Sequence, residues 1–252
     1  MHFRVVIPAR YASQRLPGKP LADLNGKPLI LHACDCARRS GAMQVIVATD
    51  DQRIQQACSA AGVEVQMTSA SHPSGTDRIA EVAERLGWDD DQWVVNLQGD
   101  EPMMPPANIE QTAALLAAHP DAGMSTLCTP IHDLADFLNP NVVKVVADGK
   151  GMALYFSRAP IPWNRDGAPG GLGSQQQHHG ALRHIGIYGY RVGALKRLAA
   201  SPATELEQLE KLEQLRALSM GLGIAVDVAR EVPGPSVDTP EDLKRVADLL
   251  KR

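Results

Sequence analysis

The chain has 252 residues, of which 44% are hydrophobic, and its formal net charge is −4 at pH 7. This length is sufficient to bury the core of one large α/β domain or of two small ones. The slight excess of acidic residues argues against a general nucleic-acid binder, which would carry a basic face. No apolar run approaches the roughly 18 residues of a membrane span, and the N-terminus has no apolar signal-peptide segment. We therefore expect a cytoplasmic protein that binds neither nucleic acid nor membrane.

The first predicted element is an apolar strand over residues 3–7, which is stopped by Pro8 and leads into a basic loop. This loop carries Arg10, Arg15 and Lys19 without an acidic residue between them. Open α/β sheets bind ligands at the carboxyl ends of their strands, and cations without counter-charges suit a polyanion such as a triphosphate. On charge alone, a solvated surface loop is the simpler interpretation.

The basic loop matches neither of two common phosphate-binding motifs. A Walker A motif requires G-x-x-x-x-G-K-[ST], but Ser13 replaces its first glycine and Pro20 follows Lys19. The dinucleotide-binding fingerprint G-x-G-x-x-G does not follow the first strand either. If the loop binds phosphates, it does so with cationic side chains in a different pattern.

Strands and helices then alternate along the chain. A helix is predicted over residues 29–40, a strand over 45–48, a helix over 52–61 and a strand over 63–67. This alternation is typical of a parallel sheet with right-handed crossovers. The sequence therefore predicts an α/β fold with a mainly parallel, Rossmann-like sheet and helices on both faces.

The segment Ser74-Gly75-Thr76-Asp77-Arg78 precedes a helical run over residues 79–86. Thr76 suits the N-cap position of that helix. A helix start would explain the polar residues at the beginning of this segment. It would not explain Arg78, because a cation in the first turn opposes the helix dipole. Arg78 therefore predicts an anionic or hydrogen-bond-accepting group close to the helix start.

A further apolar strand over residues 93–97 ends in Gln98-Gly99-Asp100-Glu101-Pro102. The carboxylates follow the carboxyl end of the strand, at the same sheet edge as the basic loop. An Asp-containing turn explains this pattern as well as a metal site does. Because Mg²⁺ prefers one or two carboxylates together with phosphate oxygens, a triphosphate loop beside Asp100 favours the magnesium site.

The second half of the chain changes character. It contains a Gly- and Gln-rich segment over residues 164–180 without periodicity, as expected of a lid or a disordered loop. His178 and His179 lie in this segment and are predicted to be solvated. Strands are predicted over residues 123–129, 142–146 and 153–156, with a short helix over 134–137.

A strand over residues 183–191 would place His184, Gly186, Tyr188 and Tyr190 on one face. Such a polar, aromatic face is unusual in a core, and a half-exposed strand explains it. A helix is predicted over residues 205–220, where leucines recur at every third position. Successive leucines of this line rotate by about 60° around the helix axis. We therefore expect other elements to cover the helix on more than one side, and a second subunit could supply one of these contacts.

The C-terminal part is predicted as a strand over residues 224–228 and a helix over 240–250. Thr239 suits the N-cap and Pro240 the first turn of this helix. Asp238 is then not required as a cap and can face a ligand, although it could also serve as a second-best capping residue.

Five segments, in this order, resemble a known family: A-R-x-x-S-x-R-L-P-G-K-P after the first strand, S-G-T-D-R, L-Q-G-D-E-P, H-I-G-I-Y-G-Y and V-D-T-P-E-D-L. Together they resemble the sugar nucleotidyltransferases, especially the cytidylyltransferases that activate acidic sugars such as 3-deoxy-manno-octulosonate (KDO). The similarity extends over almost the entire chain.

The resemblance implies cytidylyl transfer from CTP to a keto-sugar acid, with release of pyrophosphate and Mg²⁺ as cofactor, in a homodimer. It also implies a single domain over residues 1–252. In this domain, residues 1–120 would bind the nucleotide, 121–220 would form a smaller lobe for the acceptor and for dimerisation, and 221–252 would supply a closing strand and helix.

The resemblance also implies a role for individual residues of this sequence. Arg10, Arg15, Lys19 and Asp100 would be catalytic, and Asp100 and Asp238 would hold Mg²⁺. Ser13, Ser74, Gly75 and Arg78 would contact the nucleotide. The sugar acid would be bound by Gln98, Arg158, His184, Tyr188, Glu213 and Gln214, with Arg158 at the carboxylate. From the residues alone, Glu213 and Gln214 could equally be a solvated pair.

Two other functions stay open at this point. One is a cytidylyltransferase for another sugar acid, such as a sialic acid or 8-amino-KDO. The other is a non-catalytic nucleotide-sensing module on the same fold. The presence of Lys19, Asp100 and Asp238 argues against a sensor, which could lose its metal ligands.

Overall fold

The computed structural model describes residues 1–12 and 15–251, and its centre is one large twisted sheet. The strand order is β11-β7-β10-β6-β1-β4-β5, with β8 and β9 attached beside β10. Every strand along this order runs in one direction except β10, which is antiparallel to both of its neighbours. The α/β fold with a mainly parallel sheet is therefore confirmed.

The strands of this sheet are β1 (Phe3–Ala9), β4 (Gln44–Thr49), β5 (Glu64–Met67), β6 (Trp93–Asn96), β7 (Ala122–Pro130), β8 (Lys144–Ala147), β9 (Ala153–Ser157), β10 (Leu182–Arg191) and β11 (Gly223–Val228). The short strands β2 (Asp23–Leu24) and β3 (Lys27–Pro28) form a separate hairpin. The helices are α1 (Leu29–Arg38), α2 (Gln52–Ala60), α3 (Gly75–Arg85), α4 (Pro106–Ala118), α5 (Leu134–Leu138), α6 (Val192–Ala199), α7 (Glu205–Glu210), α8 (Gln214–Ser219) and α9 (Pro240–Leu249), and short 3₁₀ turns lie at η1 (Lys19–Leu21) and η2 (Leu172–Ser174).

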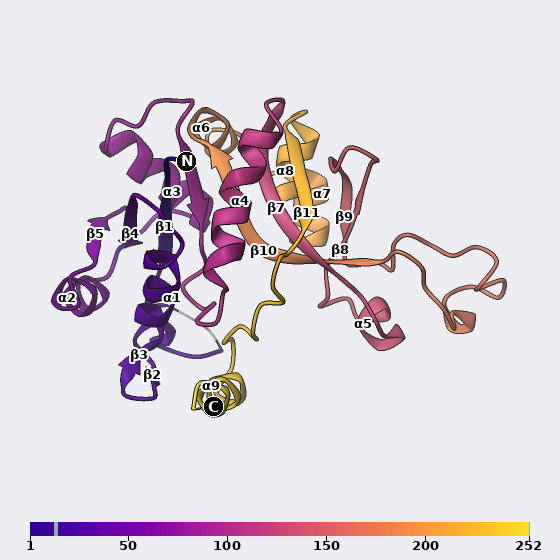
Figure 1. Ribbon diagram of the computed structural model, residues 1–252, viewed down its shortest axis with the longest axis horizontal. Helices are drawn as coiled ribbons and strands as arrows, with labels where there is room; N and C mark the ends of the chain where they lie inside the picture. The colour runs from indigo at the N-terminus through magenta and orange to yellow at the C-terminus, as the bar shows by residue number, and fades with distance from the viewer. Residues whose placement is uncertain (13–14, 252) are drawn as a thin grey trace.

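Helices cover both faces of the sheet, as the pattern of buried residues shows (Figure 1). In β1, Val5 and Ile7 join one core cluster, which includes residues of α1, α2 and α4. Val6, between them, joins the other cluster, which includes residues of α3, α6 and α8. Successive residues of a strand point to opposite faces, so this buried apolar strand is covered by helices on both sides.

Two helices, α4 and α6, were not predicted, and two predicted helices differ from the structure. The α3 helix begins at Gly75 rather than Ile79, and its N-cap is Ser74 rather than Thr76. The predicted helix over residues 205–220 is divided into α7 and α8 by Lys211, which has a φ of 53°. This break turns Leu212 into the core and leaves Leu209 72% exposed.

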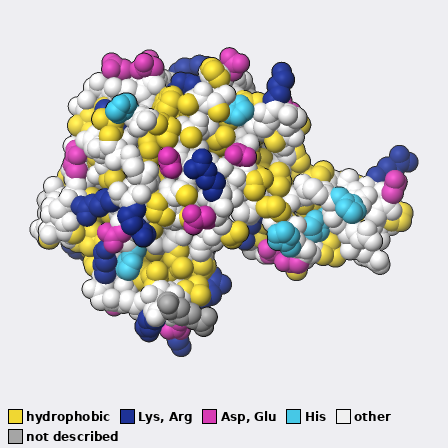
Figure 2. Space-filling view, in the orientation of Figure 1, with side chains coloured by type: hydrophobic (Ala, Val, Ile, Leu, Met, Phe, Trp, Pro, Cys, Tyr) yellow, Lys and Arg dark blue, Asp and Glu magenta, His cyan; other side chains and the backbone are white. Residues whose placement is uncertain are grey.

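The smaller second lobe projects from one end of the sheet (Figure 1). It contains the β8–β9 hairpin, α5 and the long segment over residues 158–181. Figure 2 shows histidine side chains gathered on this projection. The prediction of two solvated histidines in the long segment holds for His179, but His178 stacks on Phe137 with ring centroids 5.1 Å apart.

The C-terminal segment crosses the molecule and returns to the half formed by the N-terminal residues (Figure 1). Val237 N–H donates to the carbonyl of Asp100 at 2.9 Å, and Val237 and Val246 pack with Leu24 and Leu29. Thr239 caps α9 in a capping box with Asp242, as predicted. This return brings the C-terminal segment to the carboxyl end of β6. Among the described residues, no helix is long and apolar enough to cross a membrane.

Candidate active site

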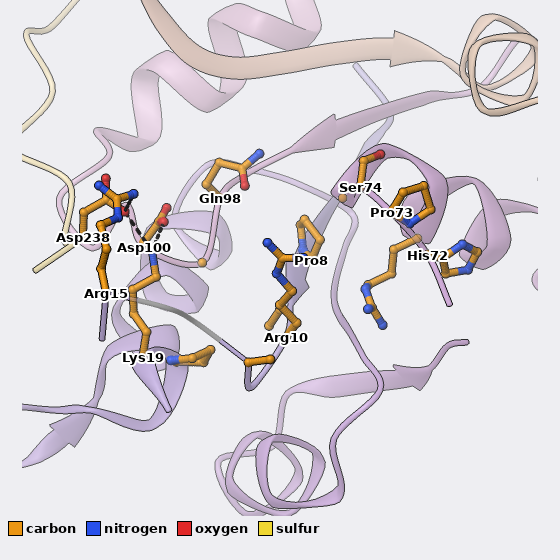
Figure 3. Close-up of a pocket in the computed structure, with 16 residues that line it drawn as sticks. Pro8, Arg10, Arg15, Lys19, His72, Pro73, Ser74, Gln98, Asp100 and Asp238 are labelled. Atoms are coloured by element: carbon orange, nitrogen blue, oxygen red, sulfur yellow. Dashed lines mark hydrogen bonds and ion pairs between the residues drawn. The ribbon is translucent and has the colours of Figure 1, made fainter. Parts of the chain in front are cut away.

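A cavity of about 770 Å³ lies at the carboxyl ends of β1 and β6. Its walls come from the basic loop, the N-terminus of α3, the turn after β6 and the segment before α9 (Figure 3). Parallel strands of open α/β sheets place their ligand sites at this edge. The cavity brings together the predicted residues Arg10, Arg15, Lys19, Ser74, Gly75, Arg78, Gln98, Asp100 and Asp238.

At one end of the cavity, Lys19 contacts both predicted metal-binding carboxylates (Figure 3). Its Nζ donates to Oδ2 of Asp100 at 2.5 Å and to Oδ1 of Asp238 at 3.1 Å, and Nη2 of Arg15 lies 3.0 Å from the same Asp238 oxygen. Burial alone would lower the pKa of Lys19, but the two carboxylates outweigh it and the pKa is raised. The ammonium group therefore stays charged between the two carboxylates.

Glu101, beside Asp100, was not selected from the sequence as a site residue. Its burial, followed by the charges of Asp100 and Asp238, raises its pKa to about 8. Three carboxyl groups close together cannot all ionise easily. The raised pKa, caused mainly by burial, favours the neutral form of Glu101, which is a poor ligand for a cation.

The start of α3 forms the opposite end of the cavity. Ser74 Oγ accepts from the backbone N–H of Asp77 at 3.3 Å, as an N-cap does. Gly75 lies so close to β1 that a Cβ at this position would meet Pro8 Cγ at 3.1 Å. The glycine is thus required by a close approach of the helix to the first strand, in addition to any contact with a ligand.

Arg78 is buried, and its predicted acceptor group is present. Its Nη1 donates to Oγ1 of Thr68 at 2.5 Å and its Nη2 donates to Oδ2 of Asp50 at 3.2 Å. The Asp50 carboxylate offsets the unfavourable position of the guanidinium in the first turn of α3. Since Arg78 also lines the cavity, a contact with the nucleotide stays a prediction.

The other predicted sugar-binding residues lie in the second lobe or at its junction, outside the lining of this cavity. Arg158 donates through Nε to the carbonyl of Glu210 at 2.6 Å and through Nη1 to the carbonyl of Pro140 at 2.9 Å. His184 and Tyr188 share one face of β10, with ring centroids 5.3 Å apart. Burial lowers the pKa of His184 to about 3 and raises that of Tyr188, so both side chains are neutral.

Glu213 and Gln214 are not a solvated pair. Glu213 Oε1 accepts from Ser74 Oγ at 2.8 Å, and Oε2 accepts from Thr76 Oγ1 at 2.8 Å. Gln214 is 2% exposed, and its Nε2 has no hydrogen-bond partner among the described residues. A buried amide without a partner is unusual in a folded protein.

His72 was missed from the sequence. It lines the cavity two residues before Ser74, and its Nε2 contacts the Glu81 carboxylate. No motif marks this histidine, because its partner lies nine residues further on. The predicted site residue Ser13 lies outside the described residues.

The chain matches the cytidylyltransferase family model over residues 4–225. It is 58% identical over 248 residues to a 3-deoxy-manno-octulosonate cytidylyltransferase of Alkalilimnicola ehrlichii, covering 98% of this chain and 96% of that protein. The enzyme of the same name from Marinobacter nauticus is 54% identical, over 100% of this chain and 98% of the relative.

A solved structure of CMP:2-keto-3-deoxy-manno-octonic acid synthetase in complex with CTP superposes on this chain with a TM-score of 0.86. The two sequences are 40% identical, and the match covers 99% of this chain and 98% of the other. Since the similarity extends over the full length of both curated relatives, the chain belongs to the cytidylyltransferase family, in the group of the 3-deoxy-manno-octulosonate cytidylyltransferases.

Proposed function

We propose that this protein transfers CMP from CTP to 3-deoxy-D-manno-octulosonate, forming CMP-KDO and pyrophosphate and so activating KDO for lipopolysaccharide synthesis. The observation that carries the proposal is the convergence of Lys19, Asp100 and Asp238 in a cavity that also receives Arg10 and Arg15. Such a cavity offers both cations for a triphosphate and carboxylates for a metal ion. The names of the curated relatives support CTP and KDO as the substrates.

The reaction is a substitution at phosphorus. The anomeric hydroxyl oxygen of KDO attacks the α-phosphorus of CTP and forms a new P–O bond. The bond from this phosphorus to the bridging oxygen of the β-phosphate breaks, pyrophosphate departs with the bonding electrons, and the hydroxyl proton passes to solvent. Such transfer depends on positioning and on neutralisation of charge, and it requires no covalent enzyme intermediate.

The basic residues at the edge of the sheet support these requirements. Arg10, Arg15 and Lys19 would hold the triphosphate and neutralise the charge that develops on pyrophosphate. Lys19 and Arg15 are already held by Asp100 and Asp238, so the two side chains are partly ordered before the nucleotide binds.

The donor set at the end of the cavity fits Mg²⁺. Asp100 and Asp238 both contact the Lys19 ammonium group, and this convergence supports a shared cation site. Among the described residues, no three histidine, cysteine or acidic side chains form a complete metal site, and Mg²⁺ requires only one or two carboxylates beside phosphate and water. When bound, Mg²⁺ would neutralise phosphate charge and acidify the attacking hydroxyl.

The acceptor site is proposed at the junction with the second lobe. Gln98 would contribute from beside Asp100, and His184, Tyr188, Glu213 and Gln214 would contact the sugar hydroxyls. Arg158 would face the sugar carboxylate, since a guanidinium can bind a carboxylate with two parallel hydrogen bonds. Its Nη2 makes no hydrogen bond to another described side chain or carbonyl, while Nε and Nη1 hold the lobe.

We further propose that the protein is a homodimer, acts in the cytoplasm and binds no nucleic acid. The second lobe and α7 expose several large apolar side chains, which would be covered by a second copy of the chain. Leu154 is 62% exposed, Leu206 44% and Leu209 72%. Symmetric pairs are the commonest oligomers of soluble proteins.

A pyrophosphate-release assay tests the proposed reaction. CTP and UTP are each supplied with Mg²⁺ and with KDO, 8-amino-KDO or a sialic acid. We expect the highest kcat/KM with CTP and KDO, because the cytosine amino group and the uracil carbonyl have opposite hydrogen-bonding character. Preference for another sugar acid would overturn KDO as the acceptor, and absence of turnover with every sugar acid would favour a nucleotide-sensing module.

A further inference from the structure

One carboxylate joins the second half of the chain to the nucleotide end of the cavity. Glu213 lies between α7 and α8, yet it accepts hydrogen bonds from Ser74 and Thr76, which lie 139 and 137 residues earlier at the start of α3. Both donor–acceptor distances are 2.8 Å. Each carboxylate oxygen therefore contacts a different hydroxyl of the same helix terminus. The single proton of the Ser74 hydroxyl is shared with Oδ2 of Asp77 at 2.6 Å, whereas Thr76 donates to Glu213.

Glu213 depends on these two contacts, because burial and the charge of Asp77 disfavour its carboxylate and raise its pKa overall. Burial raises the pKa of Glu213, while the hydroxyls of Ser74 and Thr76 and the charge of Arg216 act in the opposite direction. A buried carboxylate that loses its partners is costly, and hydrogen bonds to charged groups are stronger than those between neutral groups. The half-buried Glu213 carboxylate, whose side chain is 32% exposed, thus depends on the position of the α3 terminus, and the terminus depends on it.

Both ends of this connection are anchored. Nη2 of Arg216 lies 3.3 Å from Oε1 of Glu213 and 2.8 Å from Oε1 of Glu207, and Nη1 donates to the carbonyl of Ser201. On the other side, Tyr190 of β10 is buried; its burial raises the pKa of its hydroxyl beyond the usual range, and the Thr76 and Asn96 side chains act in the opposite direction. The connection therefore runs from the α7–α8 segment to the central sheet.

The α3 terminus has little freedom to adopt another position. Gly75 packs against Pro8 so closely that an added Cβ would lie 3.1 Å from the ring. Ser74 and Gly75 line the cavity that contains Lys19 and Asp100. A shift of Glu213 would therefore change the shape of the nucleotide end of the cavity.

We infer that Glu213 is a positioning residue that fixes the N-terminus of α3 for CTP, in addition to any contact with the sugar acid. The inference rests on the proposed CTP site. A carboxylate oxygen can accept two hydrogen bonds, so Oε2 retains one position for a sugar hydroxyl. Through this residue, the acceptor lobe also determines the geometry of the nucleotide site.

The test is a double-mutant cycle on CTP affinity, measured by calorimetry with Mg²⁺ and without any sugar acid. The variants are Glu213→Ala, Thr76→Val and the double variant. We expect each single substitution to raise the Kd for CTP by about tenfold, and the double variant to differ little from the single ones, because all three break the same connection. Glu205→Gln is the matched control, since Glu205 is an exposed glutamate of α7, and its Kd should be that of the wild type.

Two results would overturn the inference. The first is a Glu213→Ala variant that binds CTP as the wild type does but has a raised KM for the sugar acid, because Glu213 would then serve the acceptor alone. The second is a lower melting temperature in the variants with no change in Kd, which indicates a merely structural role. If Glu213→Ala fails to fold, Glu213→Asp replaces it in the double-mutant cycle, since the shorter side chain cannot contact both hydroxyls.

The calorimetric test of Glu213 can be distinguished from the test of the proposed reaction. A wild-type protein that binds CTP but releases no pyrophosphate with any sugar acid would overturn the proposed reaction, and the calorimetric cycle would still decide the role of Glu213. A wild-type protein that does not bind CTP would overturn both.

Discussion

The ammonium nitrogen of Lys19 lies 2.5 Å from a carboxylate oxygen of Asp100, although 81 residues separate the two in the sequence. The same nitrogen donates to Asp238, 219 residues away. Three segments of the chain thus meet at one ion-pair cluster, made by the basic loop, the turn after β6 and the segment before α9. The cluster places the Lys19 ammonium group where Mg²⁺ is proposed to bind and holds both carboxylates in position.

The first prediction concerns the two carboxylates. Asp100→Asn and Asp238→Asn should each lower kcat by at least about a hundredfold, since loss of one group that stabilises transition-state charge costs roughly this factor. Circular dichroism and thermal melting should show a folded protein. Asp248→Asn, an exposed position of α9, is the control. Near-normal turnover of either variant at saturating Mg²⁺ would remove that residue from the metal site.

The second prediction concerns Lys19. Lys19→Ala should lower kcat by about 10²–10³-fold, because charge develops on the departing pyrophosphate. Lys27→Ala is a suitable control, since Lys27 pairs with Asp35 on α1. Steady-state kinetics with CTP as the varied substrate decides the matter. A change in KM alone, with kcat unchanged, would show that Lys19 stabilises the bound nucleotide and the transition state equally.

The third prediction concerns Arg158. Arg158→Ala should raise the KM for the sugar acid by at least about tenfold and change the KM for CTP much less, because a charge-assisted pair to the carboxylate is lost. Arg158→Lys keeps the charge but loses the planar fork, so its KM should lie between those of the wild type and Arg158→Ala. Equal effects on both substrates would indicate that Arg158 serves mainly to hold Glu210 and Pro140.

The fourth prediction concerns pH and His184. Burial lowers the pKa of this side chain to about 3 in the folded protein, whereas the unfolded chain takes up a proton near pH 6.5. The folded state binds fewer protons than the unfolded state between these values, so the stability contribution is present above pH 6.5 and is lost as the pH falls toward 3.

Thermal melting at pH 7 and pH 4.5 measures this effect. The melting temperature of His184→Gln should fall less between the two pH values than that of the wild type, by about 2–4 °C for each kcal/mol of linkage removed. His179→Gln, at an exposed position, should behave as the wild type. An identical fall in His184→Gln would show that this histidine does not contribute to acid destabilisation.

The fifth prediction concerns assembly. Sedimentation at micromolar concentration should give a dimer for the wild type and a smaller species for Leu209→Asp, because a charge would replace an exposed leucine of α7. Val232→Asp is the control, since Val232 is 81% exposed but lies in the C-terminal segment. A monomeric wild type would contradict the proposed dimer.

The sequence by itself determined the parts of this protein that depend on local pattern. Apolar runs bounded by polar turns predicted the strands β1, β4, β5 and β6, and the order of these elements predicted the parallel sheet. The carboxyl ends of parallel strands share one edge, so the meeting of Lys19 with Asp100 followed from topology. Thr239 and Pro240 marked the start of α9 because capping is a local hydrogen-bond requirement.

The tertiary structure decided what depends on contacts between distant segments. Thr76 was expected to cap α3, but its hydroxyl contacts Glu213, and Ser74 is the cap. The break at Lys211 carries no glycine or proline signal, and it arises because one straight helix cannot turn leucines at every third position toward a single core. The sequence left the exposure of Glu213 open. Local periodicity describes only a helix surface, whereas the partners of this half-buried carboxylate are set by packing between segments 137 to 139 residues apart in the sequence.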